Sequence, residues 1–402
     1  MKICSFDFFR YECCTLCGEC LYRCPYLALG REEAVLEKRK LLEGKESQVT
    51  ERCISCYACN VFCPNDCRPY ELVTRKWFER YLREGLPARA RYLMPTLWPN
   101  FRSDLVRGMN RREKGLLEKW RETPPEGELV LYPGCNSLAL PHILDASFMK
   151  EIPVSGSWDL CCGEMYYRMG LYDQVKRRAE ELTEYYRDKK IGTMLFNCPA
   201  CLNMFRNVLP DQFGARFNFR TAYLGTYLLE QIGAGSISPV NKLDKKVTVH
   251  DSCQGRVIGE EVMSASRRLL EHCGVEIIEM ERSGKYGLCC GAAAGANRYN
   301  PFDILFAAVR ALKEGAKSKE TGAGELALYC GGCQMTLSAS QLIVPTRQPV
   351  RHVLEYVKES CGEGSYGPSR RRAFLMLFNI LAKCFPRYLS RRRFWLAEGK
   401  DG

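Results

Sequence analysis

Short apolar runs alternate with longer amphipathic stretches over the central and C-terminal parts of the chain. Four runs have the length and composition of buried strands: residues 129–132, 194–196, 247–249 and 326–329. Charged and apolar residues between them recur at helical spacing and predict helices over 173–190, 260–273 and 302–312. This alternation is typical of a parallel α/β fold, in which ligands bind beyond the carboxyl ends of the strands. We therefore expect the chemistry of this chain to lie where its strands end.

Cysteines follow these predicted strands in two sets of five. Each set contains a single cysteine, a Cys-Cys-Gly and a Cys-x2-Cys. The first set is Cys135, Cys161, Cys162, Cys198 and Cys201, and the second is Cys253, Cys289, Cys290, Cys330 and Cys333. The repetition predicts two related halves that form a pseudo-duplicated α/β unit. The first half is about ten residues shorter before its Cys-Cys pair, so we expect a shortened helix near 141–153.

A different cysteine pattern occurs twice near the start of the chain. Both copies have the spacing C-x2-C-x2-C-x3-C-P, at Cys14, Cys17, Cys20, Cys24 and at Cys53, Cys56, Cys59, Cys63. In bacterial ferredoxins this run holds two [4Fe–4S] cubes, and the fourth cysteine of each run ligates the other cube. We therefore expect Cys63 to join the first three cysteines and Cys24 to join the second three. A helical insert is predicted over 31–50, and Cys67 is predicted to be a spare.

The number of cysteines also bears on the cellular compartment. There are 24 in 402 residues, and Asp7 interrupts any export-like apolar run at the start of the chain. A disulfide framework is typical of small secreted domains, whereas C-x2-C spacing favours metal ligands in a reducing cytoplasm. Paired zinc ribbons are an alternative, but four cysteines within eleven residues is poor zinc spacing. The sequence therefore favours iron–sulfur clusters.

The formal net charge of +12 is weaker evidence than it first suggests. Ligating thiols are deprotonated, so clusters would cancel much of this positive charge. We predict no nucleic-acid partner, although a zinc-bearing nucleic-acid binder stays an alternative. Iron and acid-labile sulfide in a brown protein would eliminate that alternative.

The last part of the chain has a different character. An apolar run over 373–382 is flanked by arginines at 370–372 and 391–393. It is too short to span a bilayer, and predicts an interfacial helix or a dock for a membrane subunit. A C-terminal core helix with a solvated end is the alternative. The predicted organisation is then as follows: 1–75 two-cluster ferredoxin-like domain, 76–127 helical bridge and linker, 128–240 and 241–360 the two cysteine-rich domains, and 361–402 a basic amphipathic tail.

The two kinds of cysteine pattern together resemble the heterodisulfide reductase family, in the D-type form of its catalytic subunit, which fuses both parts. Relatives of that form include a component of the sulfite-reduction membrane complex and the iron–sulfur subunit of glycolate oxidase. The resemblance covers roughly residues 10–350 and includes all eighteen motif cysteines. It implies that one or two non-cubane iron–sulfur clusters occupy the five-cysteine sets and that disulfide cleavage takes place between them. Five ligands also exceed what one cube or one zinc ion takes.

The resemblance implies that the second set (Cys253, Cys289, Cys290, Cys330 and Cys333) is catalytic. His250, three residues before Cys253, is a candidate proton donor or cluster hydrogen-bonder, with a strand-end cap as the alternative. Arg256 and Lys285 are candidates to bind an anionic substrate, or are solvated surface residues. Ser252 stands where family members often have proline. That departure, together with the shorter first half, leaves open whether the first set is catalytic or a relay.

Two functions follow for the chain. In the first, it passes electrons through the ferredoxin-like clusters to reduce, or form, a disulfide-type substrate. In the second, it relays electrons from a flavoprotein, such as a 2-hydroxy-acid oxidase or an electron-transfer flavoprotein, to membrane quinone. The implied partners are a membrane cytochrome, a quinone-linked subunit or a flavoprotein. We expect a cytoplasmic protein on the periphery of the membrane of an anaerobe.

Overall fold

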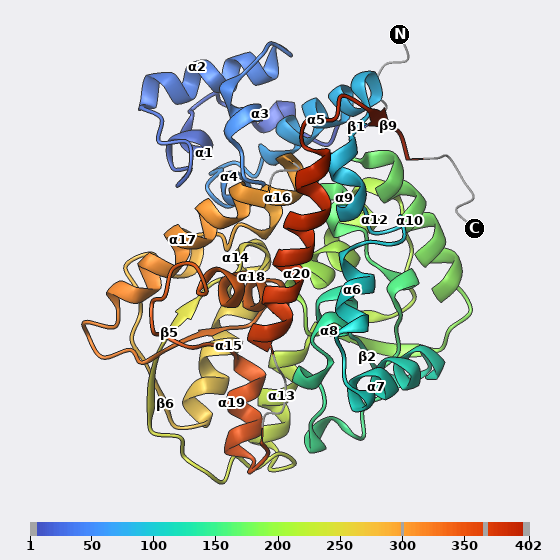
Figure 1. Cartoon of the computed structure of the whole chain (residues 1–402), viewed down its shortest axis with the longest axis vertical. Coiled ribbons are helices and arrows are strands. Elements are labelled where there is room, and N and C mark those ends of the chain that lie inside the picture. The colour runs from blue at the N-terminus through green and yellow to red at the C-terminus, as the bar shows by residue number, and fades with distance from the viewer. Residues whose placement is uncertain (1–5, 299–300, 365–368, 397–402) are drawn as a thin grey trace.

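A computed structural model describes residues 6–298, 301–364 and 369–396 of the chain. Two parallel sheets, each packed among helices, confirm the predicted mixed α/β fold (Figure 1). The first sheet contains β2 (Gly127–Tyr132), β3 (Ile191–Phe196) and β4 (Arg220–Tyr223) in that order. The second has the order β6 (Val275–Ile277), β5 (Lys245–His250), β7 (Glu325–Leu328) and β8 (Val350–His352). The four predicted strands are therefore β2, β3, β5 and β7.

The two sheets have closely similar strand orders. β2, β3 and β4 follow one another as β5, β7 and β8 do, and every neighbouring pair is parallel. In the second sheet, β6 pairs with the outer side of β5. At the equivalent position of the first sheet there is a single parallel bridge between Leu131 and Val154. In the second half, α15 (Glu260–His272) connects β5 to β6 and buries Val262, Leu269 and Leu270 against the core. Apolar residues on one stripe of this helix explain its formation at that position.

The first half has no α-helix at the equivalent point, so the expected shortened helix near 141–153 is wrong. Two 3₁₀ turns, η3 (Pro141–Ile143) and η4 (Ser147–Met149), occupy that stretch instead. Pro141 lacks an amide hydrogen and Pro153 limits the residue before it, so a short segment between them has little room for an α-helix. The other predicted helices are present as α10 (Tyr172–Tyr186) and α17 (Pro301–Lys317).

The N-terminal cysteine runs form a separate layer over one end of the molecule (Figure 1). This layer contains α1 (Glu19–Tyr22), α2 (Arg31–Leu42), α3 (Gln48–Arg52) and α4 (Ala58–Val61). The predicted helical insert is α2 and α3. The next helix, α5 (Tyr70–Glu84), is long and amphipathic, and buries Trp77, Phe78 and Tyr81 between this layer and the first half.

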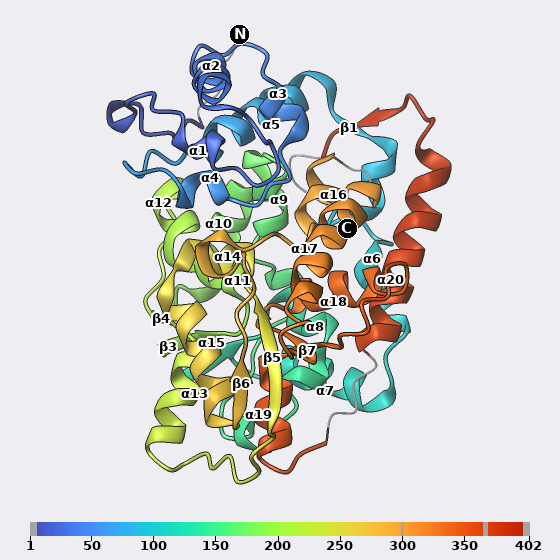
Figure 2. The same cartoon turned by 90° about the vertical axis from the view of Figure 1, so that its left-hand side faces the viewer.

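The stretch before the first sheet is helical, as predicted, with α6 (Phe101–Arg107) and α7 (Arg111–Glu122). The tail helix α20 (Ser369–Cys384) runs along the outside of the molecule, as the red helix in Figure 2. Beyond it, β9 (Arg393–Phe394) pairs antiparallel with β1 (Leu86–Pro87) next to the N-terminal layer. No helix among the described residues is long and apolar enough to cross a membrane.

The tail helix has two different faces. Ala373, Ile380 and Cys384 are buried against the body of the protein, whereas Phe374 and Phe378 are exposed. Arg372 is also buried and forms a 2.6 Å ion pair with the buried carboxylate of Glu113 in α7. Although burial opposes ionisation, hydrogen bonding from His142 and the Arg372 charge lower the pKa of Glu113 to about 2. One side of this helix therefore belongs to the core, while docking of the other side to a membrane or a membrane subunit stays a prediction.

Candidate metal centre

All ten cysteines of the two sets line one cavity, which contains about 800 Å³ of space free of protein atoms. Cys135 is the second residue of α8 (Gly134–Ala139) after β2, and Cys198 precedes α11 (Pro199–Asn203) after β3. In the second half, Cys253 begins α14 (Cys253–Ile258) after β5, and Cys330 precedes α18 (Gly331–Ser340) after β7. Because parallel strands end at the same edge, the topology gathers these residues as the sequence predicts.

The two Cys-Cys pairs reach the same cavity from loops that end in glycine. Gly163 follows Cys162 with φ of 78°, and Gly291 follows Cys290 with φ of 85°. These left-handed conformations favour glycine, and a Cβ at Gly291 would lie 2.6 Å from the carbonyl oxygen of Ile304. The loop glycines therefore let α9 (Glu164–Arg168) and α16 (Ala292–Arg298) begin immediately after each cysteine pair.

The sulfur atoms lie close to one another within and between the sets. The Sγ atoms of Cys162 and Cys201 are 3.6 Å apart. Thiol hydrogen bonds from Cys135 and Cys162 lower the pKa of Cys161, and bonds from Cys201 and Cys330 lower that of Cys198. Because Cys330 belongs to the second set, its bond to Cys198 brings the two sets into direct contact.

Two buried arginines approach the cysteines, and neither was predicted from the sequence. Nη2 of Arg102, from α6, lies 3.3 Å from Sγ of Cys161. Nη2 of Arg168, from α9, lies 3.1 Å from Sγ of Cys253. A guanidinium beside a sulfur stabilises the thiolate, which is the form that binds metal. No local sequence signal distinguishes these arginines from the many solvated ones, because their partners are distant in the chain.

The N-terminal cysteines fall into two groups, and their ligation of two clusters in the crossed arrangement stays a prediction. Cys14, Cys17, Cys20 and Cys63 line one small cavity. In the other group, burial and the nearby Cys56 raise the pKa of Cys24 to about 12. Cys67 lies beside the first group, where its backbone N–H donates to Sγ of Cys63 over 3.3 Å. Whether Cys67 is a spare or a ligand stays a prediction.

The two N-terminal loops share one backbone conformation. Leu16 and Gly18 in the first loop have φ of 55° and 74°, and Ser55 and Tyr57, at the matching positions, both have φ of 59°. A four-residue helix follows each loop at the same offset, as α1 and α4. Left-handed residues between closely spaced cysteines turn the chain around a common centre, as cube ligation requires.

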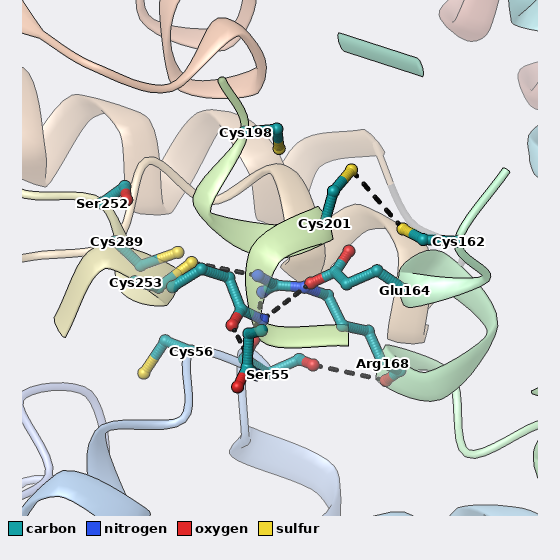
Figure 3. Close-up of polar contacts among 12 residues, drawn as sticks. Ser55, Cys56, Cys162, Glu164, Arg168, Cys198, Cys201, Ser252, Cys253 and Cys289 are labelled. Carbon is teal, nitrogen blue, oxygen red and sulfur yellow. Dashed lines mark hydrogen bonds and ion pairs between the residues drawn. The ribbon is translucent and has the colours of Figure 1, made fainter. Parts of the chain in front are cut away.

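The second N-terminal loop lies against the ten-cysteine cavity. Cys56 packs in one buried cluster with Cys253 and Cys289. Nη1 of Arg168 donates to the Ser55 carbonyl oxygen over 2.6 Å, and Arg168 also pairs with Glu164 (Figure 3). Arg168 therefore joins this loop to Cys253, as its central position in Figure 3 shows.

Arg256 reinforces the same junction from the second half. Its guanidinium donates to the carbonyl oxygens of Cys56 over 3.2 Å and Gly287 over 2.7 Å. Arg256 is buried, so the hypothesis of a solvated residue is wrong for it, and these backbone contacts occupy its guanidinium. Lys285 is exposed and is not among the residues that line the cavity. Binding of an anionic substrate by either residue stays a prediction.

His250 ends β5 and is buried, but it is not among the residues that line the ten-cysteine cavity. Burial lowers the pKa of its imidazole to about 4, so the ring is uncharged at neutral pH. Its predicted role as a proton donor or hydrogen-bonder toward a cluster stays a prediction.

The donor set fits iron–sulfur clusters better than single metal ions. All eighteen motif cysteines are free thiols. Among the described residues, no three His, Cys, Asp or Glu side chains converge closely enough to bind one metal ion. In a cluster, by contrast, each thiolate binds a different iron, so the sulfur atoms surround a larger body. The spacious ten-cysteine cavity and its buried arginines suit such an anionic group.

Comparison with known protein families shows which class of domain the two cysteine-containing halves resemble. The family model for CCG, a cysteine-rich domain, matches residues 132–206 and 247–338. These two segments contain all ten cysteines of the cavity, five in each. The chain is therefore similar to the CCG cysteine-rich domain in two segments, one in each half.

Individual relatives are similar over most of the chain. The D-type subunit of dihydromethanophenazine:CoB–CoM heterodisulfide reductase from Methanosarcina barkeri is 24% identical, covering 87% of this chain and 94% of its own length. The glycolate oxidase iron–sulfur subunit of Escherichia coli is 23% identical over 86% of this chain and 93% of its own. EtfAB:quinone oxidoreductase of Syntrophomonas wolfei is 26% identical over 67% of this chain and 39% of its own. The resemblance to the D-type form of heterodisulfide reductase is thus confirmed, and these three relatives are a reductase subunit, an iron–sulfur subunit of an oxidase and a quinone oxidoreductase.

Proposed function

We propose that this chain is an iron–sulfur subunit that carries electrons to a disulfide-type substrate at the ten-cysteine cavity. Two [4Fe–4S] clusters would be held in the crossed arrangement, one by Cys14, Cys17, Cys20 and Cys63 and the other by Cys53, Cys56, Cys59 and Cys24. The two five-cysteine sets would hold paired non-cubane clusters. The observation that carries the proposal is that ten cysteines from two similarly ordered sheets line a single cavity.

The reaction requires two electrons and two protons to convert one disulfide into two thiols. The clusters, when bound, would supply the electrons one at a time, and their iron would bind each of the two substrate sulfur atoms. The chain's own residues hold the cavity in shape: Arg102 and Arg168 balance the negative charge of thiolates at Cys161 and Cys253. Small residues at Ala200, Ala293 and Gly332 line the cavity between the two sets and leave room for substrate sulfur.

The route of electrons into the cavity follows from the junction at Cys56. Cys56, Cys253 and Cys289 belong to one buried cluster, so a cube bound at Cys56 would lie next to the second set. Arg168 and Arg256 fix the backbone of this loop from two different halves of the chain. We infer that electrons pass between the N-terminal clusters and the cavity through the second set, whichever direction the overall reaction takes.

A test of the function uses anaerobically purified protein, reduced viologen and a panel of small and protein disulfides. Viologen oxidation that depends on the disulfide supports the proposal. The Cys289→Ser variant should lose this activity, whereas Cys273→Ser should retain it, because Cys273 is equally buried but lines neither cysteine cavity. No turnover with any disulfide, in protein with full iron and sulfide content, would contradict the proposal.

The similarity to EtfAB:quinone oxidoreductase and to the glycolate oxidase subunit supports a second function. In it, the same clusters relay electrons from a reduced flavoprotein to quinone, and no disulfide takes part. Flavoprotein-dependent quinone reduction by a chain that ignores every disulfide would establish this second function in place of the first.

Peripheral attachment to the cytoplasmic face of a membrane, through a cytochrome or quinone-linked subunit, is part of the proposal. Exposed Phe374, Phe378, Phe385 and Leu389 on and after α20 support it, since they are accompanied by exposed arginines. Such a surface suits anionic lipid or an apolar membrane partner. Anaerobic fractionation of cells that produce the wild-type chain or a quadruple serine variant at these positions tests it.

A further inference from the structure

A second cavity lies beside the ten-cysteine cavity, on the side of the first set. We call it the apolar pocket; it contains about 910 Å³ of space free of protein atoms. Six residues line both cavities: Arg102, Cys135, Asn136, Met165, Ala292 and Gly332. Of the ten cysteines, Cys135 is the one that lines the apolar pocket, so a molecule there would contact the first cysteine set directly.

The rest of the pocket wall is built almost entirely from apolar side chains. These include Phe101, Trp158, Met335 and Leu377, which come from four different parts of the chain. Flat aromatic rings and flexible methionines suit a planar ring, and an apolar wall with few polar groups is typical of small-molecule sites. The pocket therefore favours a largely apolar ligand with a flat head.

Arg102 gives this apolar wall one specific polar feature. Its side chain is only 2% exposed, and its Nη2 donates to Cys161. Its Nε has no hydrogen-bond partner among the residues that the structure describes. The guanidinium also lies 5.4 Å from the ring of Trp158. A buried donor without a partner is costly, so a ligand with one acceptor atom at this position would complete the site.

The outer wall of the pocket indicates where such a ligand comes from. Met376, Leu377 and Ile380 of α20 line the pocket from inside. On the same helix, Phe374 and Phe378 are exposed to the outside. One helix thus separates the pocket from the surface proposed above to face the membrane.

We propose that the apolar pocket binds the ring of a lipid-soluble quinone, with one quinone carbonyl accepting a hydrogen bond from Nε of Arg102. The ring stacks among Phe101, Trp158 and the methionines, and the isoprenoid or alkyl chain leaves along α20. This assignment depends on the proposed electron-transfer function only to explain why the protein would bind a quinone. Binding itself is a property of the pocket and is measured without turnover.

The experiment measures equilibrium binding of a fully substituted benzoquinone with a ten-carbon chain, which cannot alkylate thiols. Oxidised holoprotein is dialysed anaerobically against the quinone, with no electron donor present. Wild-type protein should bind one molecule per chain. Leu377→Trp should weaken binding at least about tenfold by filling the pocket. The matched control, Phe378→Trp, changes the adjacent, outward-facing residue and should stay within about twofold of the wild type.

Iron, acid-labile sulfide and melting temperature of both tryptophan variants verify that they are folded and loaded. Equal binding by Leu377→Trp and the wild type would overturn the assignment, as would the absence of saturable binding. Didecyl disulfide, tested in parallel, distinguishes the chemistry: if it binds in a Leu377-dependent manner and the quinone does not, the quinone assignment is wrong. Quinone binding by a protein that reduces no disulfide would instead contradict only the disulfide function.

Discussion

The two cysteine sets have the same spacing, yet their surroundings differ. The second set packs against the N-terminal loop that contains Cys56, through the cluster that includes Cys253 and Cys289. The first set instead borders the apolar pocket, through Cys135 and Arg102. Duplicated motifs thus provide similar cysteines, while one set faces the N-terminal loop and the other faces an apolar pocket. The following predictions test this division, from the largest expected effect to the smallest.

Replacement of equivalent cysteines should have unequal consequences for electron entry. Cys289→Ser should slow electron transfer from the N-terminal clusters into the cavity by more than about 100-fold, since even changes to residues that only support metal ligands cost about 10–100-fold. Cys161→Ser should leave this first transfer within about threefold of the wild type, because its set is farther along the proposed route. Rapid mixing with reduced viologen, followed by cluster absorbance, measures the transfer.

The control for this comparison is Cys273→Ser, which changes a buried cysteine outside both sets. If Cys161→Ser and Cys289→Ser slowed electron entry equally, the two sets would not be ordered along one route.

The buried ion pair that joins the tail helix to α7 should contribute strongly to the stability of the fold. Arg372 joins α20 to Glu113 and also donates to the Ala139 carbonyl oxygen, over 3.0 Å. Arg372→Met leaves a buried carboxylate without its guanidinium partner and should lower the free energy of unfolding by about 3–5 kcal/mol. Chemical denaturation measures this change, and the exposed Arg371→Met should cost less than about 0.5 kcal/mol.

The same ion pair predicts an acid dependence of stability. The pKa of Glu113 is lowered to about 2, so its contribution is fully present above the ordinary carboxyl pKa of about 4.5. It is lost as the pH falls toward 2, when the carboxylate takes up a proton. Wild-type protein should therefore lose stability below pH 4.5 more steeply than a Glu113→Gln variant. Parallel slopes for the two proteins would mean that the carboxylate is not stabilised in the folded state.

The junction between the N-terminal loop and the second set should be sensitive to the shape of one cation. Arg168→Lys keeps the charge but cannot donate to the Ser55 carbonyl and Cys253 together, and should cost about 1.5–3 kcal/mol of stability. It should also shift the electron paramagnetic resonance spectrum of a cluster bound by the second cysteine set more than that of a cluster bound by the first set. Arg187→Lys, at an exposed position, is the control; a shift confined to the cluster of the first set would contradict the junction.

The smallest change in stability is expected on the outer face of α20. Phe378→Ser should alter the free energy of unfolding by less than about 0.5 kcal/mol, because the ring is exposed. It should nevertheless reduce sedimentation with vesicles that contain anionic lipid. Unchanged sedimentation in the quadruple serine variant of Phe374, Phe378, Phe385 and Leu389 would show that this face does not bind lipid.

The sequence predicted what depends on local spacing. Strands such as 247–249 and the cysteines that follow them were identified because periodicity and motif spacing are local properties. The crossed grouping of Cys63 and Cys24 was predicted from the ferredoxin motif. The short strands β4, β6 and β8 were missed, since charged or polar residues interrupt the apolar run in each of them.

The contacts that shape the site were not predictable in this way. Arg102 lies 59 residues from Cys161, and Arg168 lies 85 residues from Cys253. Nothing in the local sequence distinguishes a guanidinium that the fold will bury from one that it will leave in water. The apolar pocket likewise combines residues of α6, α18 and α20, and its existence depends on how these helices pack.

The second left-handed residue of each N-terminal loop, Gly18 in one and Tyr57 in the other, has a consequence for cutting the chain into fragments. A glycine such as Gly18 adopts this backbone conformation readily, but Tyr57 is strained in it. The contact between the Tyr57 ring and the Arg168 guanidinium, 4.9 Å from the ring centre, holds Tyr57 in place. A fragment cut after residue 75 would keep the glycine that shapes its first loop and lose the partner that holds its second. Such a fragment should assemble one cube more readily than the other, so the cut would sever a shared structure and would not release an autonomous ferredoxin.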